Sequence, residues 1–331
     1  MKTNQTLRSL LFGTCAALML YGCSKQNQAI IPPPSANTTT GGIHKYGLLP
    51  TPEAEYSVVP QYSEADFRSR NIENSTKASP PASVLTLVTP AIRNQEQLGA
   101  CTGFCGSEAY EILYYYKNGA FPSVTSPLFL YWNERVNVLG DQPDQDYGAN
   151  MVNIDQALTT YGICTETLMP YPSAAQAVDT DPNESIDTSP SFTTPPTSAA
   201  VTNALGYEIS SYKLINTGDT AAVKTCLRNN VPVMMGINVY DNTRTYQYFE
   251  GLNTTSYTYN PLTSSGSLVR GLTLLGGHAI PIIGYDDTKK AFKVQNSWGT
   301  SWGLNGFFYM PYSVFMSTKI VPQGGVYYAT L

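Results

Sequence analysis

The chain has 331 residues, and charged side chains make up 13% of them. This length allows one large domain or two lobes around a sizeable core, together with extensions. The formal net charge is −5, and removing Lys2 and Arg8, the only charged residues before Cys23, would take it to −7. An acidic chain without a basic stripe cannot offset phosphate charge, so we expect no nucleic-acid partner.

Residues 1–22 have the pattern of a signal peptide. Lys2 and Arg8 supply positive charge, and residues 10–21 form an apolar stretch too short to span a bilayer. The stretch ends in Leu-Tyr-Gly-Cys, which resembles a bacterial lipobox with cleavage before Cys23. Acyl chains on Cys23 would anchor the protein to a membrane of the cell envelope, facing the periplasm or the surface. The alternative is an ordinary secretory signal followed by an incidental cysteine.

Residues 23–79 follow as a polar segment rich in Pro, Asn, Thr, Ser and Gln. Such a composition predicts an extended tether with little fixed structure. Part of residues 53–74 could instead dock on the active site as an inhibitory prosegment, and the sequence leaves this open. The folded domain is expected from residue 80 to residue 331.

Cys101 is expected at the start of a helix. A short strand at residues 84–88 precedes a polar loop at 94–100, and an apolar pattern of helical spacing then runs to Asn118-Gly119. The first turn of a helix has unpaired N–H groups and the positive end of the helix dipole, both of which favour a thiolate. The alternative is that Cys101 is a small buried apolar residue.

Among the remaining elements, the expected helices cluster before residue 200 and the expected strands after it. Residues 170–200 are rich in Ser, Thr, Pro and Asp and read as a surface insertion with Phe192 as the one anchor. The pattern predicts an α+β fold. The expected helices begin at Ser126-Pro127, span 150–161 and span 219–230, and the expected strands span 231–240, 276–285, 291–296 and 306–310.

His278 and Asn296 are expected to lie side by side at one edge of the sheet. His278 opens a buried strand, a turn follows at Asp286-Asp287, and Asn296 ends the returning strand. A nucleophilic cysteine needs an adjacent base, and the base needs a third group that fixes its orientation. The chain has two histidines, and His44 lies in a Pro/Thr/Gly-rich segment, so His278 is the candidate base.

Three separated motifs occur in a characteristic order. They are Gln95 with Cys101 six residues later, Gly-His-Ala at 277–279, and Asn-Ser-Trp-Gly at 296–299. With these motifs, residues 80–331 resemble the papain-like cysteine peptidases, in particular their bacterial members. The resemblance implies a helical N-terminal lobe at about 91–205 and an antiparallel β lobe at about 206–331, with the active-site cleft between them.

The resemblance also implies a cysteine-type endopeptidase that acts on proteins or peptides without a cofactor or metal. Cys101 would be the nucleophile, His278 the general base and acid, and Asn296 the orienting amide. Gln95 would stabilise the oxyanion together with the Cys101 N–H. Activity would then extend from mildly acidic to neutral pH. By position, the residues that would line the substrate site are Tyr147, Gly148, Gly277 and Trp298, and the bare backbone at Gly148 could pair with a peptide as in strand addition.

The chain departs from the family pattern around the cysteine. Leu98 stands in place of a disulfide-forming cysteine, Thr102 in place of an aromatic residue, and Glu96 in place of glycine. We expect three further cysteines to be buried free thiols. Cys101 and Cys105 have a Cys-x3-Cys spacing, but the second pair of ligands that a metal site needs is missing. Those three cysteines are Cys105, Cys164 and Cys226.

Two other functions remain open. The chain could be a lipid-anchored binding protein on a peptidase fold that has lost its activity. It could also be a cysteine amidase or transpeptidase that acts on cell-wall peptides, because an amine can resolve the same acyl-enzyme when water is excluded.

Overall fold

The computed structural model describes residues 44–65, 67, 83–172 and 192–331. The predicted signal peptide, Cys23 and part of the 170–200 insertion lie outside these ranges. The helices are α1 (Glu53–Tyr56), α3 (Cys101–Asn118), α4 (Pro127–Trp132), the π-helix η2 (Asn133–Leu139), α5 (Met151–Thr160), α7 (Ser198–Ala204), α8 (Thr220–Arg228) and α9 (Tyr312–Phe315). The strands are β1 (Val84–Thr86), β2 (Ser211–Leu214), β3 (Val233–Asp241), β4 (Thr273–Asp286), β5 (Ala291–Gln295), β6 (Phe307–Pro311) and β7 (Val326–Thr330).

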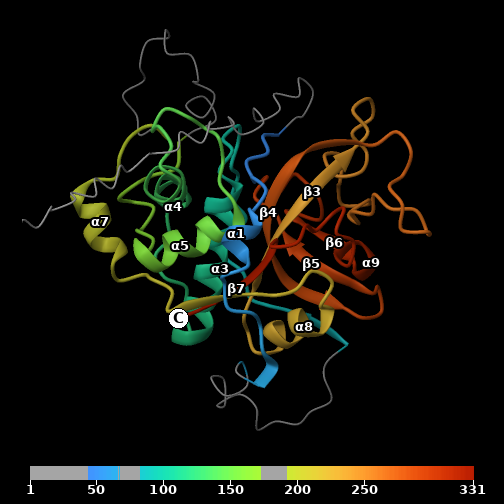
Figure 1. Cartoon of the computed structure of the whole chain (residues 1–331), viewed down its shortest axis with the longest axis horizontal. Helices are drawn as coiled ribbons and strands as arrows, with labels where there is room; N and C mark the ends of the chain where they lie inside the picture. The colour runs from blue at the N-terminus through green and yellow to red at the C-terminus, as the bar shows by residue number, and fades with distance from the viewer. Residues whose placement is uncertain (1–43, 66, 68–82, 173–191) are drawn as a thin grey trace, which may run out of the picture. The chain divides into compact units, whose positions relative to one another are not determined.

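Helices and strands separate along the chain as an α+β fold. The strands form one antiparallel sheet in the order β2-β7-β3-β4-β5-β6, and β1 pairs with β4 beside this path. Figure 1 shows α4, α5 and α7 on one side and β3 to β6 on the other, with α3 between them. Helix α3 packs directly against β4. The predicted α+β fold, with most helices in the first half of the domain and an antiparallel sheet in the second, is confirmed.

The helix signals in the sequence act as expected. The Ser126 hydroxyl accepts from the Phe129 N–H, with Pro127 as the first helical residue of α4. Asn150 and Asn153 form a capping box at the start of α5. The helix that begins at Cys101 ends at Gly119, which has φ +78°, a left-handed conformation that glycine adopts without strain.

Two strands and the extent of a third were not predicted. Strand β4 has 14 residues, and His278 lies within it rather than at its start. Strands β2 and β7 pair with each other, with Ser211 opposite Thr330, so each depends on a partner more than a hundred residues away. The short helix α7 falls partly in the stretch that was predicted to be an insertion without structure.

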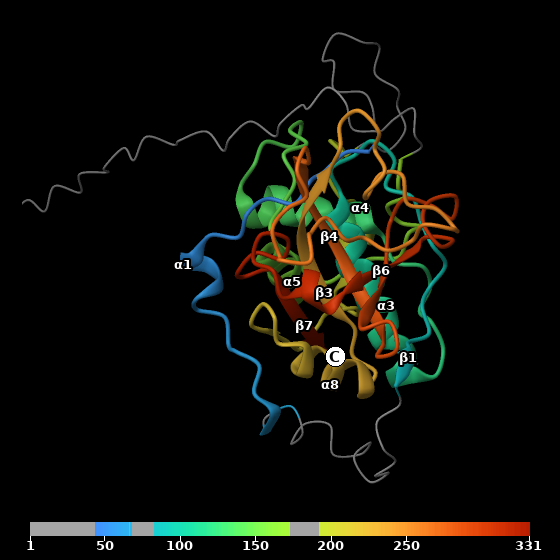
Figure 2. The ribbon, with the colours of Figure 1, turned by 90° about the vertical axis from the view of Figure 1, so that its right-hand side faces the viewer.

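Residues 44–65 lie packed against the domain instead of forming the extended tether expected for 23–79. Val59 and Phe67 are buried in the main hydrophobic core. The Tyr62 N–H donates to the carbonyl of Leu214, the last residue of β2. Figures 1 and 2 show the segment ahead of α1 running beside the strands before α1 emerges at the surface. None of the described helices is long and apolar enough to cross a membrane.

The four cysteines within the described ranges are buried free thiols, as expected for all but the proposed nucleophile.

Close to Cys101, the fully buried Glu134 accepts a hydrogen bond from the Thr102 hydroxyl. Burial raises the pKa of Glu134 from its ordinary value of 4.5 to about 8, although Thr102 and Arg135 oppose the shift. Glu134 therefore holds its proton at neutral pH in the folded protein.

We expect Glu134 to make the protein less stable as the pH rises from about 4.5 to about 8. In this window the unfolded chain releases a proton that the folded chain retains, so the free energy of unfolding falls, by on the order of a few kcal/mol, and levels off above the folded pKa. Glu134→Gln removes this titration, and its urea-unfolding midpoint should fall less over the same range. The exposed Glu53→Gln is the control, and equal slopes for Glu134→Gln and wild type would contradict the account.

Candidate active site

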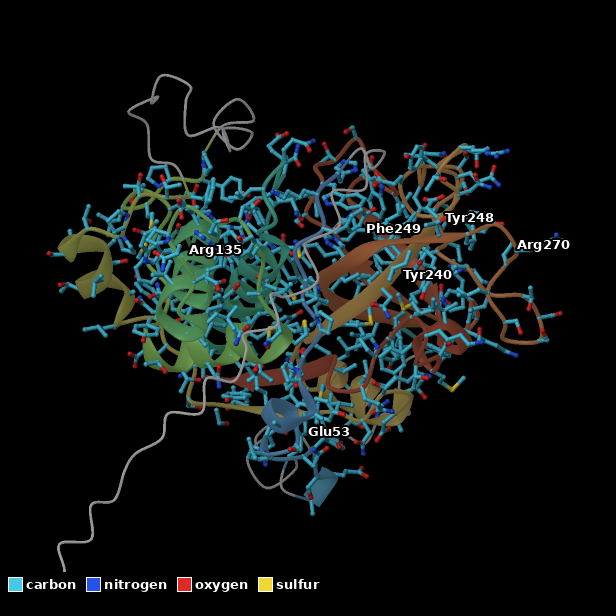
Figure 3. The ribbon with its side chains drawn as sticks, turned by 45° about the horizontal axis from the view of Figure 1, so that its top comes forward. Glu53, Arg135, Tyr240, Tyr248, Phe249 and Arg270 are labelled. Atoms are coloured by element: carbon cyan, nitrogen blue, oxygen red, sulfur yellow. The ribbon has the colours of Figure 1, made fainter. Side chains whose placement is uncertain are left out.

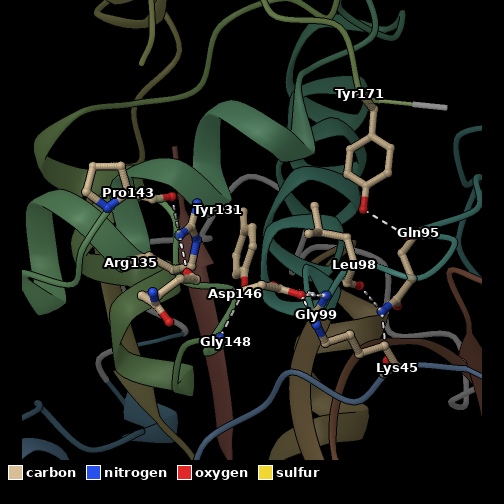
Figure 4. Close-up of polar contacts among 11 residues, drawn as sticks. Lys45, Gln95, Leu98, Gly99, Tyr131, Arg135, Pro143, Asp146, Gly148 and Tyr171 are labelled. Carbon is tan, nitrogen blue, oxygen red and sulfur yellow. Dashed lines mark hydrogen bonds and ion pairs between the residues drawn. The ribbon is translucent and has the colours of Figure 1, made fainter. Parts of the chain in front are cut away.

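Cys101 is the first residue of α3 and is fully buried. The loop before it is fixed by Asp146, whose carboxylate accepts from the Gly99 N–H at 3.1 and 3.2 Å. The same carboxylate accepts from the Tyr131 hydroxyl, as Figure 4 shows. Glu96 in this loop has φ +51°, a conformation that favours glycine, which is the residue that the resemblance leads one to expect here.

His278 and Asn296 meet as the sequence predicted. Asn296 directly follows β5, and the pairing of Ile282 with Val294 brings the β5 end toward His278 on β4. His278 Nε2 lies 2.7 Å from Asn296 Oδ1, which also accepts from the Ser297 N–H. Because Oδ1 can only accept, Nε2 carries the ring proton, and Nδ1 of the neutral imidazole is left with a lone pair.

The cysteine sulfur lies against the strand that carries His278. The Ala279 backbone lowers the pKa of the Cys101 thiol, and helix α3, which begins at Cys101, packs against β4. Ala279 is the residue after His278, so Cys101 lies beside the part of β4 that carries the imidazole. Within the described residues, His278 Nδ1 has no hydrogen-bond partner and is available to share a proton.

The Gln95 side chain is held at both ends. Its Oε1 accepts from the Ser297 hydroxyl at 2.8 Å, which turns the Nε2 group away from Ser297. Nε2 donates to the carbonyls of Leu98 and Lys45, at 3.0 and 3.2 Å. Ser297 is thus a positioning residue that sequence reasoning did not single out, although it stands inside the Asn-Ser-Trp-Gly motif.

Neither reactive group is ionised in this state. Burial raises the pKa of the Cys101 thiol to about 11, and hydrogen bonds from Ala279 and Gly47 offset this only in part. Burial also lowers the pKa of His278 to about 4, while Asn296 acts in the opposite direction. The thiolate expected from the helix start is therefore absent here, because the cost of desolvation exceeds the effect of the helix end.

The burial has a clear cause, since residues 44–49, which we call the inserted segment, lie between the lobes. The Leu48 N–H donates to the Gly277 carbonyl at 3.0 Å, and the Leu49 N–H donates to the Ala149 carbonyl at 2.9 Å. The Ala149 N–H in turn donates to the Gly47 carbonyl at 3.0 Å. The segment therefore pairs as a strand with both lobes at once.

The side chains of the inserted segment reach further contacts. Lys45 forms an ion pair with Asp146, and its backbone carbonyl accepts a hydrogen bond from the Gln95 side-chain amide, as Figure 4 shows. The His44 ring stacks on Trp298, with ring centroids 3.9 Å apart and planes within 3°. His44 and Tyr46 both reach the carboxylate of Glu250, each at 2.6 Å.

Comparison with known proteins agrees with this geometry. A sequence model of papain family cysteine proteases matches residues 84–322. The chain belongs to the papain family. Among solved structures it is similar to xylellain, a cysteine protease from Xylella fastidiosa, with a TM-score of 0.69 and 24% identity over 88% of this chain and 97% of that one. It is also similar to procathepsin L2 of Tenebrio molitor larval midgut, with a TM-score of 0.57 and 19% identity over 86% and 78% of the two chains.

The papain-family relatives in sequence are distant. An uncharacterised peptidase C1-like protein of Acanthamoeba polyphaga mimivirus is 28% identical over 231 residues, which are 66% of this chain and 63% of the viral protein. Gamete and mating-type specific protein A of Dictyostelium discoideum is 26% identical over 219 residues, which are 65% of this chain and 39% of that protein. The matches thus span less than two thirds of these relatives.

The residues expected to bind substrate in this papain-family fold lie around the inserted segment. Gly277 pairs with it directly, and the buried Trp298 stacks on it. The pairing expected at Gly148 falls instead on Ala149, because the Gly148 N–H donates to the Tyr131 hydroxyl. Gly148 still needs to be a glycine, since a Cβ there would lie 1.9 Å from the Gly47 carbonyl oxygen. Tyr147 is 44% exposed.

Sequence reasoning missed the groups that hold this site in shape. Asp146 and Tyr131 fix the cysteine loop, and Glu250 faces the inserted segment from a loop after β3. His44 was set aside because of the composition around it. Within the described ranges, no three His, Cys, Asp or Glu side chains gather in a way that could hold a metal ion.

Proposed function

We propose that this papain-family protein is a cysteine endopeptidase that hydrolyses peptide bonds through an acyl-enzyme. The observation that carries the proposal is the placement of Cys101, at a helix start, beside the strand that holds the His278–Asn296 pair. The backbone pairing of the inserted segment supports an extended peptide as substrate, because a peptide can use the same groups of Ala149 and Gly277.

In the first half of the reaction, the Cys101 proton passes to His278 Nδ1 as the sulfur attacks the carbonyl carbon. The developing oxyanion accepts from the Gln95 Nε2 group and the Cys101 N–H. His278 then returns the proton to the leaving amine, which breaks the C–N bond. In the second half, His278 takes a proton from water as the water attacks the thioester, and the thiol is restored.

We also propose that the form with the inserted segment in place is latent. The sulfur is fully buried, and the Gly47 backbone lies beside it, where it contributes to the pKa of the thiol. The Gln95 Nε2 group, which would donate to the oxyanion, already donates to the Lys45 carbonyl. The prosegment considered for residues 53–74 would thus act through residues just ahead of that range, and the segment must leave before a substrate can enter.

Loss of peptide hydrolysis in a Cys101→Ala variant is the test of the proposed activity. Reactivity of the thiol separates this proposal from a catalytically inactive binding protein. A working site should give Cys101 enhanced reactivity toward iodoacetamide at mildly acidic pH once the inserted segment is displaced. An inactive fold should leave Cys101 no more reactive than an ordinary thiol.

We propose further that the protein is a lipoprotein of the bacterial cell envelope, anchored through Cys23. The signal-like residues 1–22 and the Leu-Tyr-Gly-Cys sequence support this. We expect Cys23→Ser to move the protein from the membrane fraction to the soluble fraction of cells, and labelled palmitate should mark only the unsubstituted protein. Equal labelling of the Cys23→Ser variant would overturn the proposed anchor, and Cys226→Ser is the control.

A further inference from the structure

Glu250 is a fully buried carboxylate whose two oxygens both face the inserted segment. Its side chain is 0% exposed. His44 Nδ1 lies 2.6 Å from Oε2, and the Tyr46 hydroxyl donates to Oε1 at 2.6 Å. Both partners therefore belong to the inserted segment. When that segment leaves, as the latent form requires, both oxygens lose these partners and become available to a ligand.

The loop that carries Glu250 is held in place from within its own lobe. The Asp241 carboxylate accepts from the backbone N–H groups of Tyr248, Phe249 and Glu250, at 2.7 to 3.1 Å. The Trp302 indole N–H donates to the Phe249 carbonyl at 3.0 Å. Figure 3 shows Tyr248 and Phe249 on the sheet half of the molecule, opposite Arg135 on the helical half. Glu250 should therefore keep its position when the inserted segment departs.

Trp298 adds a flat aromatic surface next to this carboxylate. The His44 ring lies flat on the Trp298 ring while its Nδ1 reaches Glu250. Phe249 packs against Trp298 from another direction, with ring centroids 5.2 Å apart, and so fixes the indole. Glu250 and Trp298 together can therefore bind a planar group whose face stacks on the indole and whose edge donates hydrogen bonds to the carboxylate.

We propose that Glu250 and Trp298 form a substrate subsite for a planar cationic side chain, arginine foremost. The proposal rests on the peptidase function proposed above. A guanidinium group can donate to both carboxylate oxygens at once and stack its plane on an indole, which an ammonium group cannot do. His44 contacts one oxygen and Tyr46 the other, so both oxygens can be reached from the space that the inserted segment fills.

The subsite lies on the leaving-group side of the scissile bond. The acyl half of the substrate must stay bound after the leaving amine has gone. We therefore assign it to the end of the inserted segment that forms backbone hydrogen bonds, where Ala149 and Gly277 pair with residues 47–49. Glu250 and Trp298 lie at the other end of the inserted segment, at His44. The chemistry therefore selects peptides with arginine after the cleaved bond.

The test compares peptides that share one acyl half and carry arginine or its neutral isostere citrulline in the leaving half. The reference enzyme is the full chain with Gly47→Val, which we expect to displace the inserted segment because a Cβ there would lie 1.7 Å from the Gly99 carbonyl oxygen. Its kcat/KM should favour arginine by about 10- to 100-fold, the range for a charge-assisted hydrogen bond. Adding Glu250→Gln should reduce this ratio to about one, whereas adding the exposed Glu53→Gln should leave it unchanged. A ratio within one protein cancels any general loss of activity.

An unchanged arginine-to-citrulline ratio in the Glu250→Gln variant would overturn the subsite. A second readout does not need turnover, namely calorimetric binding of the same peptides to the Gly47→Val protein that also carries Cys101→Ala. If the arginine peptide binds more tightly than the citrulline peptide and Glu250→Gln removes the difference, the subsite is supported even when no peptide is cleaved. In that case only the proposed peptidase activity fails. Equal binding of both peptides, with and without the Glu250→Gln change, contradicts the subsite whatever the activity is.

Discussion

Gly47→Val in the full chain should expel the inserted segment and expose Cys101. A Cβ atom at position 47 would lie 1.7 Å from the Gly99 carbonyl oxygen and 2.4 Å from its carbon. These are backbone atoms, and the Gly99 N–H is held by the Asp146 carboxylate, so the cysteine loop cannot move aside easily. The substitution leaves every proposed catalytic residue in place, and the segment itself must shift.

The measured quantity for Gly47→Val is the rate at which iodoacetamide alkylates Cys101 at pH 6, followed by peptide mapping. With the segment present, burial keeps the thiol pKa at about 11, and each unit by which it falls gives tenfold more thiolate. We expect the rate to rise by about 100-fold or more. Ala54→Val adds similar bulk to the exposed helix α1 and should change nothing. A rate for Gly47→Val within about twofold of wild type would contradict the latent form.

Cys101→Ala, made in the Gly47→Val protein, should lower peptide hydrolysis by about 10⁴-fold or more, as removal of a nucleophile typically does. Without the sulfur no thioester can form, and the remaining groups can only bind substrate and stabilise an oxyanion. The measurement is kcat/KM on an internally quenched peptide. Cys105→Ala removes another buried thiol one turn further along α3 and should retain activity. Undiminished hydrolysis without the Cys101 sulfur would refute its role as nucleophile.

Local signals in the sequence predicted much of the fold. The Ser126-Pro127 start, the Asp219 cap and the capping residue Asn150 act within one helical turn, so they can be read without knowledge of distant contacts. Strands β2 and β7 were not predicted because their stability comes from pairing with distant strands, β2 with β7 and β7 also with β3. A strand of four or five residues carries little pattern of its own.

The chemical groups of the site could be predicted, but their state could not. Spacing and order proposed Cys101, His278 and Asn296, and the structure joins His278 to Asn296 and places Cys101 at the start of α3, the helix that packs against β4. The neutral thiol follows from burial by the inserted segment, and that segment binds largely through backbone groups of Gly47, Leu48 and Leu49. Backbone pairing cannot be read from composition, so residues 44–49 were interpreted together with the Pro- and Thr-rich residues around them as a tether.

Glu250 shows the same limit from the other lobe. In the sequence it is one carboxylate in a loop rich in Tyr, Asn and Thr, and nothing local marks it as part of the site. Its position depends on the Asp241 carboxylate, which accepts hydrogen bonds from backbone N–H groups of the loop, and on the packing of Phe249 against Trp298. Such contacts join residues on separate elements, and only the folded chain displays them.

The most direct test of the account is to find which residue carries the acyl group during turnover. The Gly47→Val protein would be mixed with a peptide p-nitrophenyl ester, quenched with acid within milliseconds and mapped by mass spectrometry. The account predicts a thioester on Cys101 that appears in the burst phase and is absent from the Cys101→Ala variant. An acyl group on any other residue, or rapid turnover with Cys101 unmodified at every time point, would contradict it.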